Sequence, residues 1–130
     1  MVGPATLAAM RRAVSLILDV CCVLAFVALG RNTHHAGDSA AGIWHTAWPF
    51  LAGLGLGLAA GRGWQRPFAL VPTGLVAWAG AAGAGMVIRV LAGQGTAAAF
   101  IVVAFAFLGL FLLGWRVVAR IVTTRLSALG

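Results

Sequence analysis

Acidic residues and several common catalytic side chains are scarce in this chain of 130 residues. The sequence holds two aspartates and no glutamate, lysine or tyrosine, and 8% of its residues are charged. A soluble domain carries about 25% charged residues. The sequence also has no paired carboxylates in an apolar run, no phosphate-binding glycine loop, and no serine or cysteine beside a histidine. We therefore expect no enzymatic activity and no cofactor.

Cysteine is equally scarce, and its placement disfavours an internal disulfide. Cys21 and Cys22 are adjacent within an apolar run. Neighbouring side chains on a helix point in different directions, which makes a disulfide between them sterically poor. We interpret both as small apolar residues.

Apolar residues dominate, because 62% of the chain is hydrophobic. A soluble domain of this length could not hide so much apolar surface, since small domains bury only part of what their chain exposes. The surplus must face lipid, so we expect residues 1–130 to form a single membrane domain. The net charge of +7 comes from nine arginines that bracket the apolar stretches, and such a distribution forms no surface for nucleic acid.

Four apolar segments can be separated along the chain: residues 13–30, 44–61, 70–91 and 97–117. Each approaches the ~20 residues needed to cross ~30 Å of hydrocarbon as a helix. The sequence therefore predicts an all-α fold, a polytopic membrane protein whose four transmembrane helices form a bundle.

The second segment is the weakest of the four. Its strongly apolar part begins only at Ala47, and Pro49 fits the first turn of a helix, where a missing N–H is tolerated. A helix beginning at Pro49 would be too short to cross without thinning the bilayer. A re-entrant second segment is therefore the alternative to a full span.

The arginines predict the orientation of the chain, because cytoplasmic loops keep positive charge. One face receives only Arg31 and Arg89. The other receives seven arginines: Arg11, Arg12, Arg62, Arg66, Arg116, Arg120 and Arg125. Both termini are therefore expected in the cytoplasm.

Tryptophan is placed mostly near the predicted span ends, where indole rings prefer the headgroup level. We interpret four of them as interfacial anchors: Trp44, Trp48, Trp64 and Trp115. Trp78 lies deeper, so its N–H needs a hydrogen-bond acceptor within the bundle.

Small residues recur every four positions in the second and third segments. The second carries Gly53, Gly57 and Gly61, and the third carries Ala77, Ala81 and Gly85. This spacing lets helix backbones approach closely, which is how helices associate in lipid. The pattern fits a tightly packed monomer or a homo-oligomer and does not choose between them.

Asp19 is the first candidate for a functional residue, because it lies six residues into the first segment, about 9 Å of helix from its inner end. Ionisable residues inside a membrane usually face the bundle and have partners. The fourth helix brings Arg116 to a comparable depth, so we predict an Asp19–Arg116 pair. It is either a structural ion pair or a site that titrates a proton or cation, as in small multidrug transporters.

An outer polar cluster is predicted at the opposite face from Arg31, Arg89 and the first external loop, which holds His34, His35 and Asp38. Imidazole and carboxylate groups could ligate zinc or iron, but the spacing matches no known metal motif, so we assign no metal. An anion site built from both arginines and a histidine is a second interpretation. The third is a solvated loop whose arginines extend to the headgroups.

Several short motifs resemble one uncharacterised prokaryotic membrane family, the domain of unknown function 3054 (DUF3054). They are Asp19, Gly30-Arg31 with His34, Trp48-Pro49-Phe50, Gly85-Met86 to Arg89, Phe100 and Gly114-Trp115-Arg116. The resemblance covers most of the chain. It implies a four-helix protein of a bacterial or archaeal cytoplasmic membrane and implies no activity.

Two functions fit these observations. The first, which we predict, is a small-solute or ion transporter or channel that works as a homo-oligomer, because polar groups lie near both ends of a short bundle. Asp19 is its titrating group, and Arg31, His34 and Arg89 form an outer vestibule. An alternative stands beside it. The second is a non-transporting accessory or assembly subunit that binds a partner membrane protein through its glycine faces. The second is favoured by how few polar groups lie at mid-membrane depth, where transporters place their sites.

Overall fold

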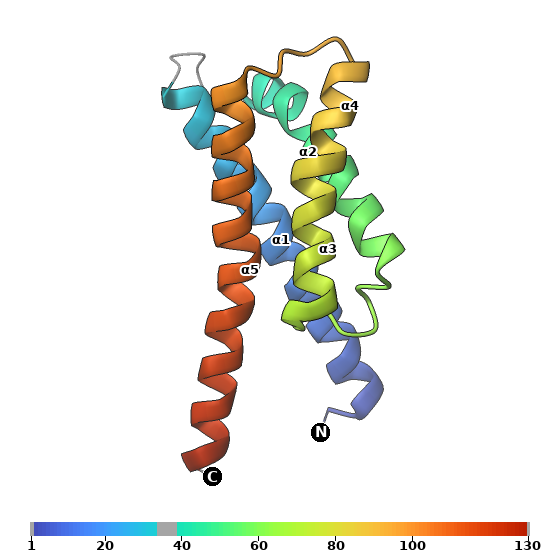
Figure 1. Ribbon diagram of the computed structural model, residues 1–130. Coiled ribbons are helices and arrows are strands. Elements are labelled where there is room, and N and C mark those ends of the chain that lie inside the picture. Colours follow the sequence, from blue (N-terminus) through green and yellow to red (C-terminus); the bar gives the residue numbers. More distant parts are fainter. Residues whose placement is uncertain (1, 34–38, 130) are drawn as a thin grey trace.

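The computed structural model describes residues 2–33 and 39–129, and these form helices joined by loops (Figure 1). The described residues contain no β-strand, so the all-α prediction is confirmed. The elements are α1 (Pro4–Thr33), α2 (Ala40–Ala60), the stretch Leu70–Leu91 and α5 (Ala98–Leu129). The stretch Leu70–Leu91 departs from helical geometry at Val71, and it contains η1 (Leu70–Gly74), α3 (Leu75–Trp78), η2 (Ala79–Ala84) and α4 (Gly85–Leu91). The N- and C-terminal ends lie at the same end of the molecule in Figure 1.

Three of these segments are long and apolar enough to cross a membrane: Pro4–Arg31, Leu70–Leu91 and Ala98–Leu129. α2 is not one of them, because the first half of this helix carries Trp44, His45, Thr46, Trp48 and Pro49. It is the segment that the sequence marks as the weakest. The structure thus supports a membrane protein through three segments.

The outer surface of the helices has the composition that lipid requires. Ile17 on α1 and Val102 and Leu110 on α5 keep 60%, 68% and 69% of their surface exposed. Each fully exposed aliphatic side chain would cost about 1.5–3 kcal/mol in water relative to burial. A hydrocarbon environment removes that cost, so the outward apolar faces of α1 and α5 agree with their role as membrane helices.

Two helices are longer than the spans expected from hydropathy. α1 begins at Pro4 rather than near residue 13, and α5 continues to Leu129 rather than ending near residue 117. A helix of 30 residues is about 45 Å long, whereas the hydrocarbon core is ~30 Å thick. Both helices extend at the end of the molecule where the termini lie.

The start of α2 differs from the expectation that Pro49 occupies its first turn. The helix begins at Ala40, where the Gly42 N–H donates a hydrogen bond to Ser39 Oγ at 3.1 Å, and Pro49 lies in its interior. Proline cannot donate to the carbonyl four residues earlier, that of His45. The side-chain amide of Gln94 donates to the His45 oxygen instead, at 3.1 Å. A neighbouring hairpin therefore satisfies the group that proline leaves without its usual partner.

An aromatic cluster joins three helices in the core. The ring centroid of Phe26 on α1 lies 5.4 Å from that of Phe50 on α2, and 5.9 and 5.4 Å from those of Phe100 and Phe107 on α5. Phe50 and Phe100 are 6.0 Å apart. The indole N–H of Trp78, which the sequence places well inside the third apolar segment, donates to the Phe105 carbonyl at 2.9 Å, so it has the acceptor that we predict.

Glycines on α2 bring this helix into backbone contact with the Leu70–Leu91 stretch. A Cβ atom built on Gly57 would collide with the carbonyl oxygen of Val76, and one built on Gly53 would lie 2.6 Å from the Gly85 nitrogen. On Gly61 it would lie 2.5 Å from the Val76 side chain. Gly53 and Gly57 on α2 and Gly61 directly after it therefore all lie on the contact face.

The predicted small-residue face of the third segment is only partly this contact face. Gly85 belongs to it, and the other closest approaches to the α2 glycines use Val76 and Gly80. Ala77 and Ala81 are fully buried in the core. The reason for the partial match is a wide helical turn at Ala79–Ala84, where the Gly85 N–H pairs with the Gly80 carbonyl five residues back. The extra residue places Gly80 and Gly85 on one face and breaks the four-residue spacing.

Gly57→Ala should separate α2 from the Leu70–Leu91 stretch, because the new methyl group would overlap the Val76 carbonyl. We expect a loss of about 1–3 kcal/mol in unfolding free energy, measured by thermal unfolding in a mild detergent. Gly55→Ala is the matched control on the same helix, since a Cβ there has no atom within 4 Å. If Gly57→Ala is as stable as Gly55→Ala, the two helices do not approach as described.

Candidate functional site

Asp19 on α1 and Arg116 on α5 meet in the interior of the bundle. Arg116 Nη1 and Nη2 donate to Asp19 Oδ1 and Oδ2, each at 2.8 Å, in a two-pronged geometry that is among the strongest for a charged pair. Asp19 is 0% exposed and Arg116 is 1% exposed. The structure thus brings together the two residues that the sequence suggests as partners.

Every donor of the Arg116 guanidinium has an acceptor. Besides the two bonds to Asp19, Nε donates to the Pro67 carbonyl at 3.1 Å, Nη1 to the Leu112 carbonyl at 3.0 Å and Nη2 to Ser15 Oγ at 3.3 Å. A guanidinium has five N–H groups, so none is left without a partner. The Leu112 carbonyl lies four residues back on the same helix, and Pro67 lies on the loop before Leu70.

Trp115 and Ser15 complete the site. The indole N–H of Trp115 donates to Asp19 Oδ1 at 2.9 Å, and its ring lies 4.3 Å from the Arg116 guanidinium carbon. Ser15 Oγ donates to the Pro67 carbonyl at 3.1 Å. Trp115 is thus a hydrogen-bonding member of the site rather than only the headgroup anchor that its position suggests.

The positions of Ser15 and Trp115 relative to the charged pair are visible in the sequence, although a hydropathy profile does not use them. Ser15 lies four residues before Asp19, so both side chains share one face of α1. Trp115 precedes Arg116 directly, but only the packing of α5 against α1 shows that its N–H points at the carboxylate. The Pro67 carbonyl could not have been found from the sequence, because a main-chain acceptor carries no residue signature.

The arrangement is an ion pair that is fully satisfied within the chain. No buried side-chain nitrogen or oxygen of the described residues lacks a hydrogen-bond partner. Removing two charges from water costs several kcal/mol per ion, and their attraction offsets this only with good geometry and further hydrogen bonds. Here both conditions are met, so the pair fixes α1, α5 and the loop before Leu70 to one another.

Arg89 organises the opposite end of the bundle. Its Nε and Nη2 donate to the Gly95 carbonyl at 3.2 and 2.6 Å, and Nη1 donates to Gln94 Oε1 at 2.7 Å. Its guanidinium carbon lies 4.7 and 5.7 Å from the ring centroids of Phe100 and Phe50. Since Gln94 also donates to the His45 carbonyl, Arg89 supports the proline-containing part of α2.

The remaining members of the outer polar cluster are only partly placed. Arg31 Nη1 donates to Thr46 Oγ1 on α2 at 3.1 Å. His34, His35 and Asp38 lie outside the described residues, and an anion site at this loop stays an interpretation of the sequence. In the described part of the chain, no three His, Cys, Asp or Glu side chains gather as metal ligands.

Neutralising either member of the Asp19–Arg116 pair should destabilise the protein, because the partner keeps a buried charge without compensation. We expect Asp19→Asn and Arg116→Gln each to lower the unfolding free energy by about 3–5 kcal/mol. The double variant should lose clearly less than the sum of the two. Thermal unfolding of all four proteins in one mild detergent measures this coupling, and strictly additive losses would show that the two residues do not interact.

The comparison with known proteins agrees with the family resemblance of the sequence motifs. No curated protein and no solved structure matches the chain. A family model described as a protein of unknown function (DUF3054) matches residues 16–119. The matched range includes Asp19, Trp115 and Arg116 at one cluster and Pro49 and Arg89 at the other. The resemblance seen in the sequence is thereby confirmed, and the chain belongs to the DUF3054 family.

Proposed function

We propose that the chain is an integral protein of a prokaryotic cytoplasmic membrane, with four spans and both termini in the cytoplasm. Besides the three apolar segments, α2 supplies one more span, because its 21 residues are about 31 Å long and nearly match the hydrocarbon thickness. Its glycine face packs along the Leu70–Leu91 stretch, and its weaker first half accepts hydrogen bonds from Arg31 and Gln94 at Thr46 and His45.

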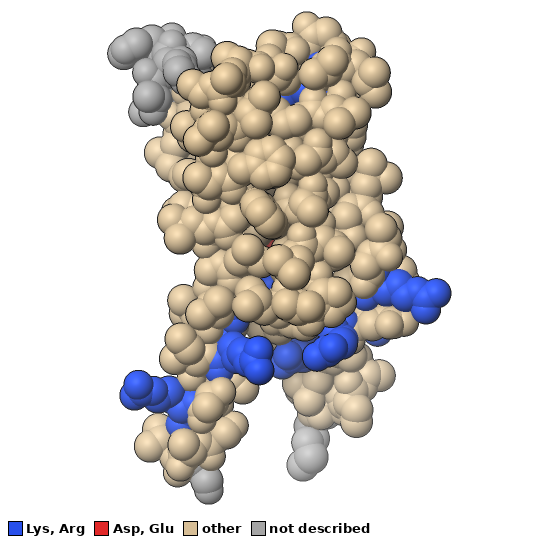
Figure 2. All heavy atoms as spheres, viewed as in Figure 1, with Lys and Arg blue, Asp and Glu red and all other residues tan. Residues whose placement is uncertain are grey.

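The distribution of exposed arginines supports this orientation. Figure 2 shows arginine atoms gathered in a band toward the end where both termini lie. The arginines classed as exposed are Arg11, Arg12, Arg62, Arg66, Arg120 and Arg125. We call this surface the arginine face. Positive charge of this kind is kept on the cytoplasmic side of a membrane.

The orientation predicts the behaviour of reporter fusions in bacterial cells. Green fluorescent protein fused after Gly130 should fluoresce, and alkaline phosphatase at the same position should be inactive, because the first requires the cytoplasm and the second the periplasm. Phosphatase inserted between α4 and α5 should be active and serves as the matched control. Active phosphatase at the C-terminus would contradict the proposed topology.

For its role, we propose a non-transporting accessory or assembly subunit of a larger membrane complex. One observation carries this choice: all five N–H groups of Arg116 and both oxygens of Asp19 are bonded within the chain. A transporter needs polar groups near the midplane that can turn to a substrate. A subunit that associates through its sides needs only a rigid bundle with apolar outer faces.

A transporter or channel, acting as a homo-oligomer, is the second candidate. It is favoured by Asp19 itself, since an ionisable residue at membrane depth usually marks a pathway. Pro67, whose carbonyl binds Arg116, also lines a groove that opens on the arginine face. Neither proposed role includes a chemical reaction, a cofactor or the binding of nucleic acid.

Proton flux and mass measurement together separate the two roles. The purified protein is placed in liposomes holding a pH-sensitive dye, and a potassium gradient with valinomycin drives proton entry. We expect wild-type and Asp19→Asn liposomes to acidify at the rate of empty ones, and native mass spectrometry of mildly solubilised protein to show a stoichiometric membrane partner. Proton entry that Asp19→Asn abolishes, with a defined homo-oligomer and no partner, would overturn the accessory role.

A further inference from the structure

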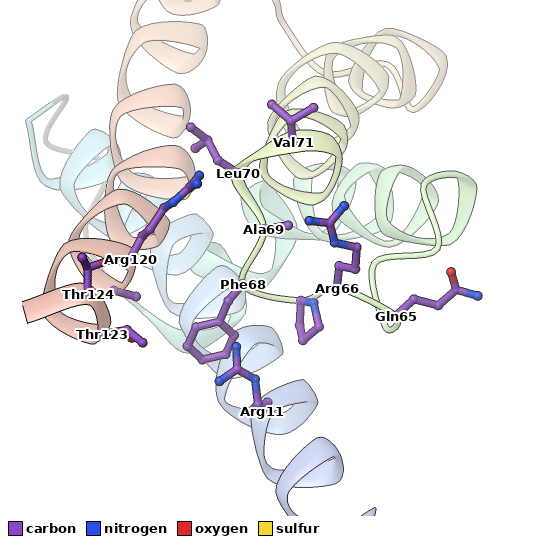
Figure 3. A pocket seen from close by; sticks show the side chains of 12 residues that line it. Arg11, Gln65, Arg66, Phe68, Ala69, Leu70, Val71, Arg120, Thr123 and Thr124 are labelled. Atoms are coloured by element: carbon purple, nitrogen blue, oxygen red, sulfur yellow. The ribbon is translucent and has the colours of Figure 1, made fainter. Parts of the chain in front are cut away.

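A groove of about 530 Å³ opens on the arginine face between the loop before Leu70 and the C-terminal half of α5 (Figure 3). We call it the arginine groove. Its charged and hydroxyl-bearing lining residues are Arg11, Arg66, Arg120, Thr123 and Thr124. Its volume lies within the roughly 300–1,000 Å³ of sites that hold small molecules. The groove lies apart from the Asp19–Arg116 pair, with Pro67 contributing to both.

The three arginines reach the groove from three different elements. Arg11 comes from α1, Arg66 from the loop and Arg120 from α5, as the labelled side chains in Figure 3 show. The Arg11 guanidinium lies 4.4 Å from the centroid of the Phe68 ring. Stacking on a ring in this way leaves the N–H groups of a guanidinium free to donate in their own plane.

Nothing acidic in the described chain offsets this charge. The groove is lined by no aspartate or glutamate. Asp19 is the one acidic residue among the described residues, and it is bonded to Arg116 and Trp115. Three cations that line one groove without a carboxylate attract an anion from outside the chain, and the planar fork of arginine matches the oxygens of a phosphate group.

The wall of the groove is held in place before any ligand arrives. The Pro67 carbonyl accepts hydrogen bonds from Arg116 Nε and Ser15 Oγ, both at 3.1 Å. The Arg66 carbonyl accepts from Thr73 Oγ1 at 2.5 Å and from the Ala69 nitrogen at 3.1 Å. Binding to a preorganised wall costs less ordering entropy than binding to a free loop. The buried ion pair thus positions the backbone that presents Arg66.

We propose that the arginine groove binds a phosphate group, held by Arg11, Arg66 and Arg120 with the hydroxyl groups of Thr123 and Thr124. The remaining wall is apolar, with Phe68, Leu70 and Val71 beside the charged rim. An apolar wall next to a basic rim at the membrane surface suits the headgroup of an anionic phospholipid. Free phosphate shares the same chemistry, and the experiment distinguishes the two sources.

The test compares two double variants that remove the same charge. Arg66→Gln with Arg120→Gln removes two positive side chains that line the groove. Arg62→Gln with Arg125→Gln removes two exposed arginines of the same face that do not line the groove. All proteins are purified in an uncharged detergent. Retained phosphatidylglycerol is counted by native mass spectrometry, and the melting temperature is followed as sodium phosphate replaces sodium chloride at constant ionic strength.

We expect wild-type protein and the Arg62/Arg125 variant to retain phosphatidylglycerol, and the Arg66/Arg120 variant to bind it at least about tenfold more weakly. A melting temperature that rises with phosphate, but without retained lipid, would support free phosphate as the ligand if the Arg66/Arg120 variant loses the rise. Equal loss of binding in both variants would overturn the proposal, since lipid binding would then depend only on the total charge of the arginine face and not on the groove. Wild-type protein that neither retains the lipid nor responds to phosphate overturns it as well, whether or not the variants fold.

Discussion

The buried pair of Asp19 and Arg116 is the constraint on which the arrangement of this bundle depends. A single charge at the centre of a span costs about 2.5–3.5 kcal/mol on insertion scales, so each partner is tolerated there only in contact with the other. The two residues lie 97 positions apart in the chain. Their contact therefore closes the first helix on the last, and Arg116 Nε also bonds to the Pro67 carbonyl in the loop that precedes Leu70.

Polar groups elsewhere in the described bundle follow the same logic. Arg89 bonds to Gln94 and Gly95. Gln94 in turn donates to the His45 carbonyl, which has no helical donor because Pro49 lacks an N–H. The Asp19–Arg116 pair and Arg89 are thus each bonded within the chain, and the sides of the bundle are apolar. Positive charge without a described acidic partner remains at the arginine face. That is why we place contact with anionic groups there, and association with a partner protein along the apolar sides.

The small-residue pattern shows how far spacing alone can be used. Gly53 and Gly57 lie on a regular helix that Gly61 caps, so their shared face follows directly from the sequence. The third segment contains a wide turn at Ala79–Ala84, which no residue type in the sequence predicts. It shifts the contact face to Gly80 and Gly85, five positions apart. Regular periodicity predicts packing faces only where the helix itself is regular.

The sequence by itself determined the membrane class, the all-α fold and the apolar segments, because these follow from composition and from the length of each apolar run. It also suggested Asp19 and Arg116 as partners, since two charges in spans of opposite direction need one another. Only the tertiary structure decided that Trp115, Ser15 and the Pro67 carbonyl complete this pair, and that Arg11, Arg66 and Arg120 line one groove. Such contacts depend on helix rotation and loop path, which are set by packing between distant segments and leave no local pattern in the sequence.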